Sequence, residues 1–169
     1  MVKLLGSVLV LLSCTGIGLS LVVSYRKYEN ALLQFIRALE YMEWELAYKM
    51  TPLPELCFNA SQECTGSVRD VLQELSGALG SQITPDASSC MSGVINKYDY
   101  LPSGLMSCLR QLSASLGRFD LSGQVQGIGS VKKMAELEIE KLSRNKDVRL
   151  RSYQTLGLCA GAALVVLFL

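Results

Sequence analysis

The residues best suited to chemistry are carboxylates in the middle of the chain. Glu40, Glu43 and Glu45 stand close together, and Asp120 follows much later. Paired carboxylates can serve as general acid and base, usually beside a nucleophile, a metal or a histidine. The chain contains no histidine, which removes the commonest general base and the usual nucleophilic triads. We therefore expect no catalytic residues and no enzymatic activity. The three glutamates are either a partner-binding patch or a solvated helix face.

Two other candidate sites fail on their spacing. The segment 127–132, GIGSVK, resembles a phosphate-binding loop only superficially, because it lacks the GK[ST] ending and no strand precedes it. The central cysteines form no CxxC pair, so a zinc site is not indicated. A net charge of +1 gives no reason to expect a nucleic-acid partner. We expect neither a metal nor a cofactor.

The central cysteines allow two interpretations. Four thiols would form two disulfides in an extracellular domain, but each lies at or near an apolar helical position. A free cysteine packs as a small buried apolar residue. We expect these residues to be reduced and to belong to the core: Cys57, Cys64, Cys90 and Cys108.

Uncharged apolar segments stand at both ends of the chain. Residues 4–25 carry no charge and lie between Lys3 and Arg26. As a helix they reach about 33 Å, enough to cross the hydrocarbon core of a bilayer. Residues 152–169 are also uncharged. We expect transmembrane spans at 1–25 and 152–169 around a domain at 26–151. In the second span, Gly157 and Gly161 have the spacing that allows another membrane helix to approach closely.

Basic residues near the spans predict the orientation. Several lie on the central side of the two spans, whereas Lys3 stands alone outside. Because cytoplasmic loops are enriched in lysine and arginine, we expect a cytoplasmic, reducing environment for the middle, with both termini across the membrane. The alternative is an exported lipoprotein or a disulfide-stabilised surface domain anchored at Cys14, since residues 11–14, LLSC, resemble a lipoprotein cleavage box. The apolar run continues to Val23, which favours an uncleaved anchor.

Residues 26–151 have helical spacing throughout and no strand-like alternation. We expect the first membrane helix to continue to Thr51, and a last helix to run from Phe119 into the second span. Between them we expect about four short helices, over 53–62, 67–79, 86–98 and 102–116. Two helices that leave and enter the same membrane must lie antiparallel. The expected fold is a membrane-anchored all-α bundle.

Local signals mark the helix ends and one close contact. We expect the Thr51 hydroxyl to cap the helix that begins at Pro52, the segment 84–86, TPD, to repeat this device, and Asp120 to cap the last helix. Gly123, Gly127 and Gly129 indicate a kink or a close helix contact. Apolar residues at steps of three and four predict the core: Leu32, Ile36, Leu39, Met42, Leu46, Met50, Val68, Val71, Leu72, Leu75, Leu79, Ala87, Met91, Val94, Ile95, Tyr98, Leu105, Leu109, Leu112, Leu116, Leu121, Val125, Ile128, Val131, Ala135, Ile139 and Leu142.

Three segments resemble the stage III sporulation protein AB family. Residues 39–53, LEYMEWELAYKMTPL, resemble its LE-x-EI-x-Y-x-x-TPL signature. Residues 116–120, LGRFD, with Gln124, resemble its LG-x-x-D-x-x-x-Q element, and residues 153–158, YQTLGL, resemble the start of its C-terminal anchor. The similarity covers nearly the whole chain. Two features depart from the family: the position around Trp44 leaves Glu43 and Glu45 as alternative counterparts of one acid, and the four central cysteines have no family role.

The resemblance implies a function that the residues alone do not reach. It implies a component of the complex that joins mother cell and forespore during endospore formation, in the mother-cell membrane facing the forespore. It implies a helical domain similar to the cytoplasmic domain of the type II secretion platform protein. By that analogy the domain would dock a cytoplasmic ATPase, stage III sporulation protein AA, to other membrane components of the channel. The implied partner-binding residues are Glu40, Glu43, Glu45, Tyr48, Thr51, Pro52, Leu53, Leu116, Gly117, Asp120 and Gln124.

Overall fold

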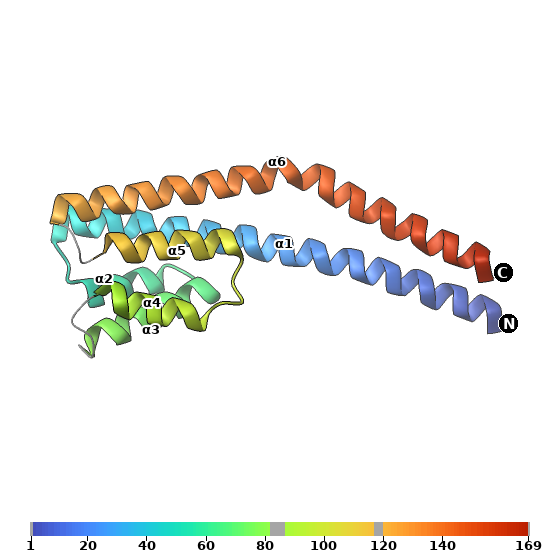
Figure 1. Cartoon of the computed structure of the whole chain (residues 1–169), viewed down its shortest axis with the longest axis horizontal. Coiled ribbons are helices and arrows are strands. Elements are labelled where there is room, and N and C mark those ends of the chain that lie inside the picture. The colour runs from blue at the N-terminus through green and yellow to red at the C-terminus, as the bar shows by residue number, and fades with distance from the viewer. Residues whose placement is uncertain (1, 82–86, 117–119, 169) are drawn as a thin grey trace. The chain divides into compact units, whose positions relative to one another are not determined.

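Helices are the only regular elements in the described part of the chain. A computed structural model describes residues 2–81, 87–116 and 120–168, and it describes side chains within 22–81, 89–116 and 120–144. No strand occurs in these ranges, so the expected all-α class is confirmed. The helices are α1 (Val2–Lys49), α2 (Leu53–Gln62), α3 (Ser67–Gly80), α4 (Ala87–Lys97), α5 (Ser103–Ser115) and α6 (Leu121–Phe168) (Figure 1).

The chain divides into two compact units, and α1 and α6 contribute to both. The larger unit, which we call the helical domain, is Asn30–Glu140; the terminal unit is Met1–Glu29 with Lys141–Leu169. In the terminal unit, the Tyr25 hydroxyl donates a hydrogen bond to the Leu142 carbonyl oxygen and so joins α1 to α6. In the helical domain, α1 ends and α6 begins at the same end, so these parts of the two helices are antiparallel (Figure 1).

The expected membrane spans fall largely outside the residues whose side chains are described. Within those residues, none of the helices combines the length and the apolar character needed to cross a bilayer. The segments 1–21 and 152–169, together with Cys14, Gly157 and Gly161, lie outside them.

Neighbouring helices of the domain are joined by side-chain contacts. The Cys64 thiol, just after α2, lies 3.2 Å from the Gln34 carbonyl oxygen of α1. Ser76 of α3 donates a hydrogen bond of 2.8 Å to the Pro54 carbonyl oxygen of α2. Helices α3 and α4, and then α4 and α5, also pack directly on each other. The short helices therefore form a continuous path from α1 to α5.

Helix α6 closes this path by contacting both α5 and α1. At Gly127, an added Cβ atom would lie 2.7 Å from the Cβ atom of Ser115 in α5, which is closer than real Cβ atoms approach. The ammonium of Lys132 lies 2.8 Å from the carboxylate of Glu43 in α1. The predicted close helix contact is thus present at Gly127.

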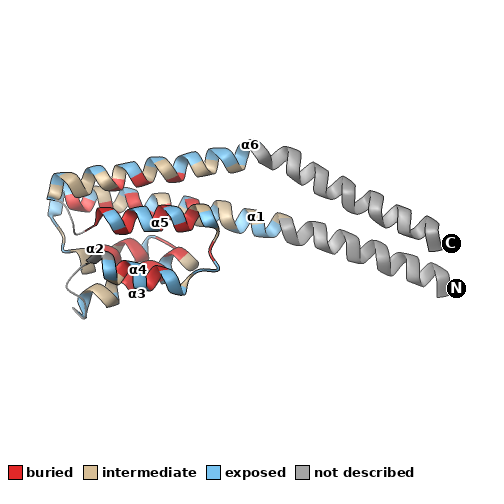
Figure 2. Cartoon of the chain, in the orientation of Figure 1, coloured by how far each residue is buried: buried red, intermediate tan, exposed pale blue. Residues whose placement is uncertain are grey.

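The core lies between these helices, on their facing sides (Figure 2). Most predicted core positions are buried, among them Leu39, Leu72 and Leu109. Several are only partly buried, namely Ile36, Leu79, Tyr98, Leu121, Val125, Ile139 and Leu142, and the side chain of Ala87 lies outside the described residues. One prediction is wrong: Met50 is 71% exposed. Helix α1 ends at Lys49, and Met50 then adopts a positive φ of 53°, so its side chain leaves the apolar stripe that the helix would have continued.

The predicted helix caps have mixed outcomes. Thr51 does not cap α2, because its hydroxyl donates instead to Glu45, and the N-cap residue is Pro52. Asp120 caps α6 as expected, since its Oδ1 accepts a hydrogen bond of 3.1 Å from the Gly123 amide. The segment 84–86 lies outside the described residues.

The four central cysteines are free thiols. Cys57, Cys64 and Cys108 are buried, as expected for core residues, while Cys90 is partly exposed. Burial raises the pKa of Cys57 to about 12 and that of Cys64 to about 11. Because the thiolate is the reactive form, these two side chains are inert at neutral pH.

Candidate functional site

The three glutamates near the end of α1 occupy three different environments. Glu40 is exposed, Glu43 is partly buried against α6, and Glu45 is only 2% exposed. Successive residues of a helix differ by about 100° in direction, which explains why neighbours in sequence separate in this way. The structure therefore does not assemble them into one acidic patch.

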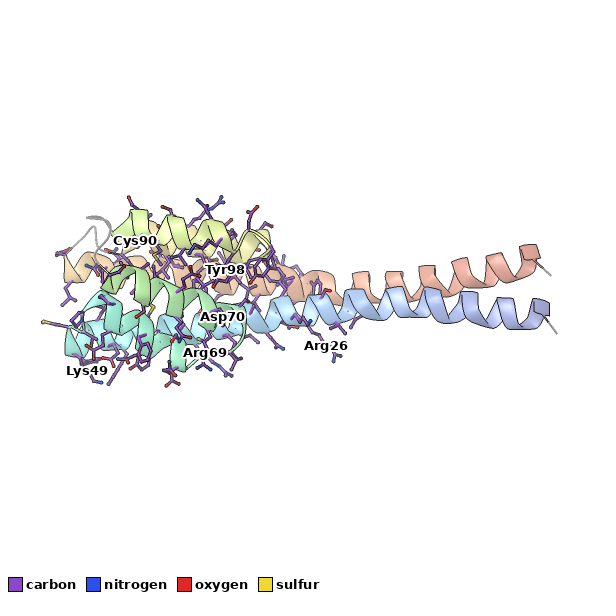
Figure 3. The ribbon with its side chains drawn as sticks, turned by 90° about the horizontal axis from the view of Figure 1, so that it is seen from below. Arg26, Lys49, Arg69, Asp70, Cys90 and Tyr98 are labelled. Carbon is purple, nitrogen blue, oxygen red and sulfur yellow. The ribbon has the colours of Figure 1, made fainter. Side chains whose placement is uncertain are left out.

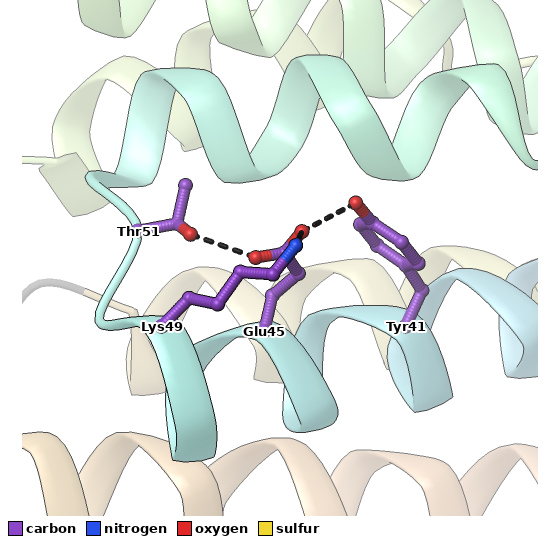
Figure 4. A network of polar contacts seen from close by, with 4 residues as sticks. All are labelled: Tyr41, Glu45, Lys49 and Thr51. Atoms are coloured by element: carbon purple, nitrogen blue, oxygen red, sulfur yellow. Dashed lines mark hydrogen bonds and ion pairs between the residues drawn. The ribbon is translucent and has the colours of Figure 1, made fainter.

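Glu45 organises a polar network at the end of α1 (Figure 4). Its Oε1 accepts hydrogen bonds from the Tyr41 hydroxyl at 2.6 Å and from the Lys49 ammonium at 3.0 Å. Its Oε2 accepts one from the Thr51 hydroxyl at 2.8 Å. Three donors thus satisfy one buried carboxylate. The hydrogen bond from Thr51 also connects the segment between α1 and α2 to the last turns of α1.

These donors also shift the protonation of the network. The hydrogen bonds from Tyr41 and then Thr51 lower the pKa of Glu45 below its ordinary value of 4.5. The same contact with Glu45 raises the pKa of Tyr41 to about 12. At neutral pH the carboxylate is charged and the phenol is protonated, so the phenol remains a donor. Glu45 is accordingly a structural residue, not an exposed docking acid.

Replacing Glu45 with Gln is expected to reduce the stability of the domain in a pH-dependent way. A carboxyl whose pKa is lowered by folding stabilises the folded state above its unfolded value and loses that effect as the pH falls through its folded pKa. Urea unfolding of wild type and Glu45→Gln from pH 7 to pH 3 measures the difference. We expect a wild-type advantage at pH 7 that shrinks below about pH 4.5. An advantage of constant size over this range would contradict the assignment.

Glu43 joins α1 to α6. Its Oε2 lies 2.8 Å from the Lys132 ammonium, and both side chains are about one third exposed or less. The contact with Glu43 raises the pKa of Lys132, with smaller contributions from Glu40 and Glu136. Glu43 is thus held in an ion pair between two helices.

Glu40 belongs to an exposed face that also carries aromatic residues. Trp44 is 50% exposed and Tyr48 is 77% exposed, and their ring centroids lie 5.8 Å apart. The Lys49 ammonium lies 5.0 Å from the centre of the Trp44 ring. We call the three residues at four-residue spacing, Glu40, Trp44 and Tyr48, the outer face of α1.

The other predicted site residues lie at the same end of the helical domain. Pro52 is exposed and Leu53 is partly buried at the start of α2. At the turn between α5 and α6, Leu116 is buried, Asp120 caps α6, and the amide of Gln124 donates to the Asp120 carbonyl oxygen at 2.9 Å. Gly117 lies outside the described residues. Figures 1 and 3 place the end of α1 and the start of α6 together at one end of the domain.

The described residues contain no metal-binding cluster, and the segment that resembles a phosphate-binding loop is helical. No group of three or more Cys, Asp or Glu side chains among them is placed to hold a metal ion. The segment 127–132 lies inside α6, and Gly127 packs against Ser115. Its backbone amides therefore belong to a helix rather than to a loop that could surround a phosphate.

Sequence reasoning missed two residues of this region. Trp44 is the only tryptophan of the chain, and it lies off the apolar stripe of its helix. Its position in the sequence could have identified it, because a large aromatic residue outside the apolar stripe of a helix is not accounted for by packing in the core. Lys132 lies 89 positions from Glu43, and no local pattern predicts that pairing.

Comparisons with known proteins agree on one family. A family profile described as "Stage III sporulation protein AB (spore_III_AB)" matches residues 3–169. A solved structure titled "Stage III sporulation protein AB (SpoIIIAB)" matches with a TM-score of 0.65 and 19% identity, over 72% of this chain and 98% of that one. At this identity the structural match shows the fold. No curated protein sequence matches the chain.

Proposed function

Because the chain belongs to the stage III sporulation protein AB family, we propose that it is a non-enzymatic membrane scaffold of the sporulation channel. In this proposal the helical domain lies in the cytoplasm and binds an ATPase, stage III sporulation protein AA. The chain would thereby hold the ATPase at the membrane, beside other membrane components of the complex between mother cell and forespore. It binds no nucleic acid.

The outer face of α1 is the observation that carries this proposal. Glu40, Trp44 and Tyr48 are exposed, whereas the opposite face of the same helix, with Phe35 and Met42, is fully buried. Exposed tryptophan and tyrosine are enriched among the residues that contribute most to protein binding. The domain therefore carries a rigid surface suited to a protein partner.

The membrane part of the proposal rests on the sequence. Residues 4–25 and 152–169 are free of charge, and basic residues including Arg26, Lys27 and Arg151 lie on their central sides. This distribution supports two anchors in the lipid bilayer with both termini on the far side. A domain held at two points would present the outer face of α1 in a restricted orientation, as a scaffold requires.

Charge reversal at Glu40 is expected to weaken binding of the ATPase. Glu40 is exposed and takes part in none of the ion pairs between described side chains, so Glu40→Lys should retain the fold. Co-purification of the ATPase with the full chain in detergent measures the effect, and we expect at least a fivefold loss of bound ATPase. Circular dichroism checks that helicity is unchanged.

Two further variants separate binding from folding. Glu136→Lys on α6 is the matched control, because Glu40 and Glu136 both act on the charge of Lys132. It should leave co-purification unchanged. Glu43→Lys alone would place two lysines side by side between α1 and α6. We therefore combine it with Lys132→Glu, which restores the ion pair with its two charges exchanged, so that the fold is retained. If Glu40→Lys binds the ATPase as wild type does, Glu40 belongs to a solvated face only.

A further inference from the structure

We infer that two aromatic residues, Trp44 and Tyr48, form a patch together with Met50, which we call the aromatic patch. This patch anchors a partner segment that contains a basic side chain flanked by aliphatic ones. This inference rests on the proposed function, because it describes the partner that the outer face of α1 receives. It goes further in naming the apolar residues at the centre of the site and the chemistry of the partner.

The patch combines exposure with order. Trp44 and Tyr48 contact each other from adjacent turns of α1, and the Lys49 ammonium rests near the Trp44 ring. Lys49 is itself held by Glu45, and Thr51 is held by the same carboxylate (Figure 4). The network thus fixes both residues that flank Met50 in sequence. Aromatic side chains in a fixed arrangement lose little conformational entropy when a partner binds.

Met50 supplies an independent observation. Its φ of 53° lies in the left-handed region, which disfavours residues other than glycine, asparagine and aspartate. Its side chain is 71% exposed and makes no contribution to the core. A glycine would terminate α1 with less strain. A strained, exposed methionine at this point is therefore explained by a role for its side chain outside the domain.

The charges around the patch indicate a basic partner. Glu40 precedes Trp44 by one turn, and Glu55 on α2 is exposed. The charges of Glu55 in α2 and of Glu63, which directly follows α2, both act on Tyr41, so two acids lie near this part of α1. Lys49 is neutralised by Glu45, which leaves Arg37 as the nearby cation of α1. The excess of carboxylates favours a lysine or arginine on the partner, and aromatic rings add a cation–π contribution.

The single tryptophan allows a direct test. We would incorporate 5-fluorotryptophan into the full chain in detergent, which gives one ¹⁹F resonance, and titrate it with the unlabelled ATPase. We expect that resonance to shift or broaden as the ATPase is added. The double variant Trp44→Ala with Tyr48→Ala should lower the affinity at least tenfold in a calorimetric titration.

The matched control is Tyr100→Ala. Tyr100 is 73% exposed, and its ring contacts that of Tyr98 in a tilted arrangement, as the ring of Tyr48 contacts that of Trp44. Its ring lies beside that of Tyr98, which Figure 3 shows well separated from Lys49. Its removal should change the affinity less than twofold. Raising the ionic strength should weaken wild-type binding, as a basic partner requires.

The outcomes distinguish this inference from the proposed function. If the wild-type chain does not bind the ATPase, both are overturned. If it binds and the double variant binds equally well, the aromatic patch is wrong and the adaptor role stands. If the ¹⁹F resonance moves with the concentration of the chain alone, the occupant is a second copy, and the inference is overturned.

Met50→Gly is expected to change stability and affinity in opposite senses, which a purely structural role of Met50 would not give. Glycine relieves the positive φ, so the urea midpoint of unfolding should rise. The same change removes the side chain, so the affinity for the ATPase should fall at least threefold. A higher midpoint with unchanged affinity would remove Met50 from the site.

Discussion

Leu109→Asp is expected to unfold the helical domain. Leu109 lies in α5 and is 1% exposed, surrounded by the core. The change removes a buried leucine side chain and places a carboxylate at a position that is closed to water. Large-to-small replacement in a core costs about 2–5 kcal/mol, and an unpaired charge costs more. A domain of this size has a total stability of about 5–15 kcal/mol.

Circular dichroism and urea unfolding check this expectation. The matched control is Gln111→Asp, which introduces the same side chain at an exposed position of the same helix. We expect the control to keep its unfolding midpoint within the range of surface substitutions, about 0.5 kcal/mol. A folded Leu109→Asp domain of near wild-type stability would show that α5 does not occupy the core.

Gly127→Ala is expected to destabilise the domain, although alanine is the better helix former. The new Cβ atom would lie 2.7 Å from Ser115 Cβ and 2.9 Å from its Oγ. The Cβ atom cannot rotate away, so α5 and α6 must separate. Overpacking of this kind costs about 1–3 kcal/mol, whereas alanine in place of glycine gains about 1 kcal/mol. The clash therefore wins, and thermal unfolding should occur at a lower temperature than in wild type.

Two companion variants identify the cause. In Gly129→Ala the new Cβ atom would meet only Glu43 Oε1, at an ordinary 3.7 Å, so the helix gain should dominate and stability should rise. Combining Gly127→Ala with Ser115→Gly removes the opposing Cβ atom and should recover much of the loss, while Ser115→Ala keeps that atom and should not. Equal effects of alanine at 127 and 129 would contradict the close contact of α5 with α6.

The fold was largely predictable from the sequence because its core has a strong helical period. Residues such as Leu72 and Leu109 stand at spacings that fit only helices, and glycines and prolines mark the ends. The failures come from single residues at helix ends. The apolar spacing of α1 continues through Met50, yet the chain turns at that residue. Thr51 stands before a proline, as a helix-capping residue often does, but its hydroxyl donates a hydrogen bond to the carboxylate of Glu45.

The candidate site was less predictable, because side-chain environment depends on contacts distant in sequence. Glu43 and Glu45 are alike in sequence, but α6 brings Lys132 to the first and the start of α2 brings Thr51 to the second. Only Glu40 retains the exposed character that was expected of all three. The resemblance to a family pointed to this region of α1 as partner-binding, and the structure divides the region into a buried polar network and an exposed face.

Photo-cross-linking in sporulating cells would show whether the outer face of α1 contacts the ATPase. A photoreactive phenylalanine derivative, which keeps an aromatic ring at the position, would replace Trp44 in the chain. A second strain would carry it at Tyr100, which is 73% exposed against 50% for Trp44 and is therefore at least as accessible. We expect a covalent product with the ATPase, identified by mass spectrometry, from position 44 and not from position 100. Products of equal yield from both positions, or the absence of the ATPase from the products at position 44, would contradict it.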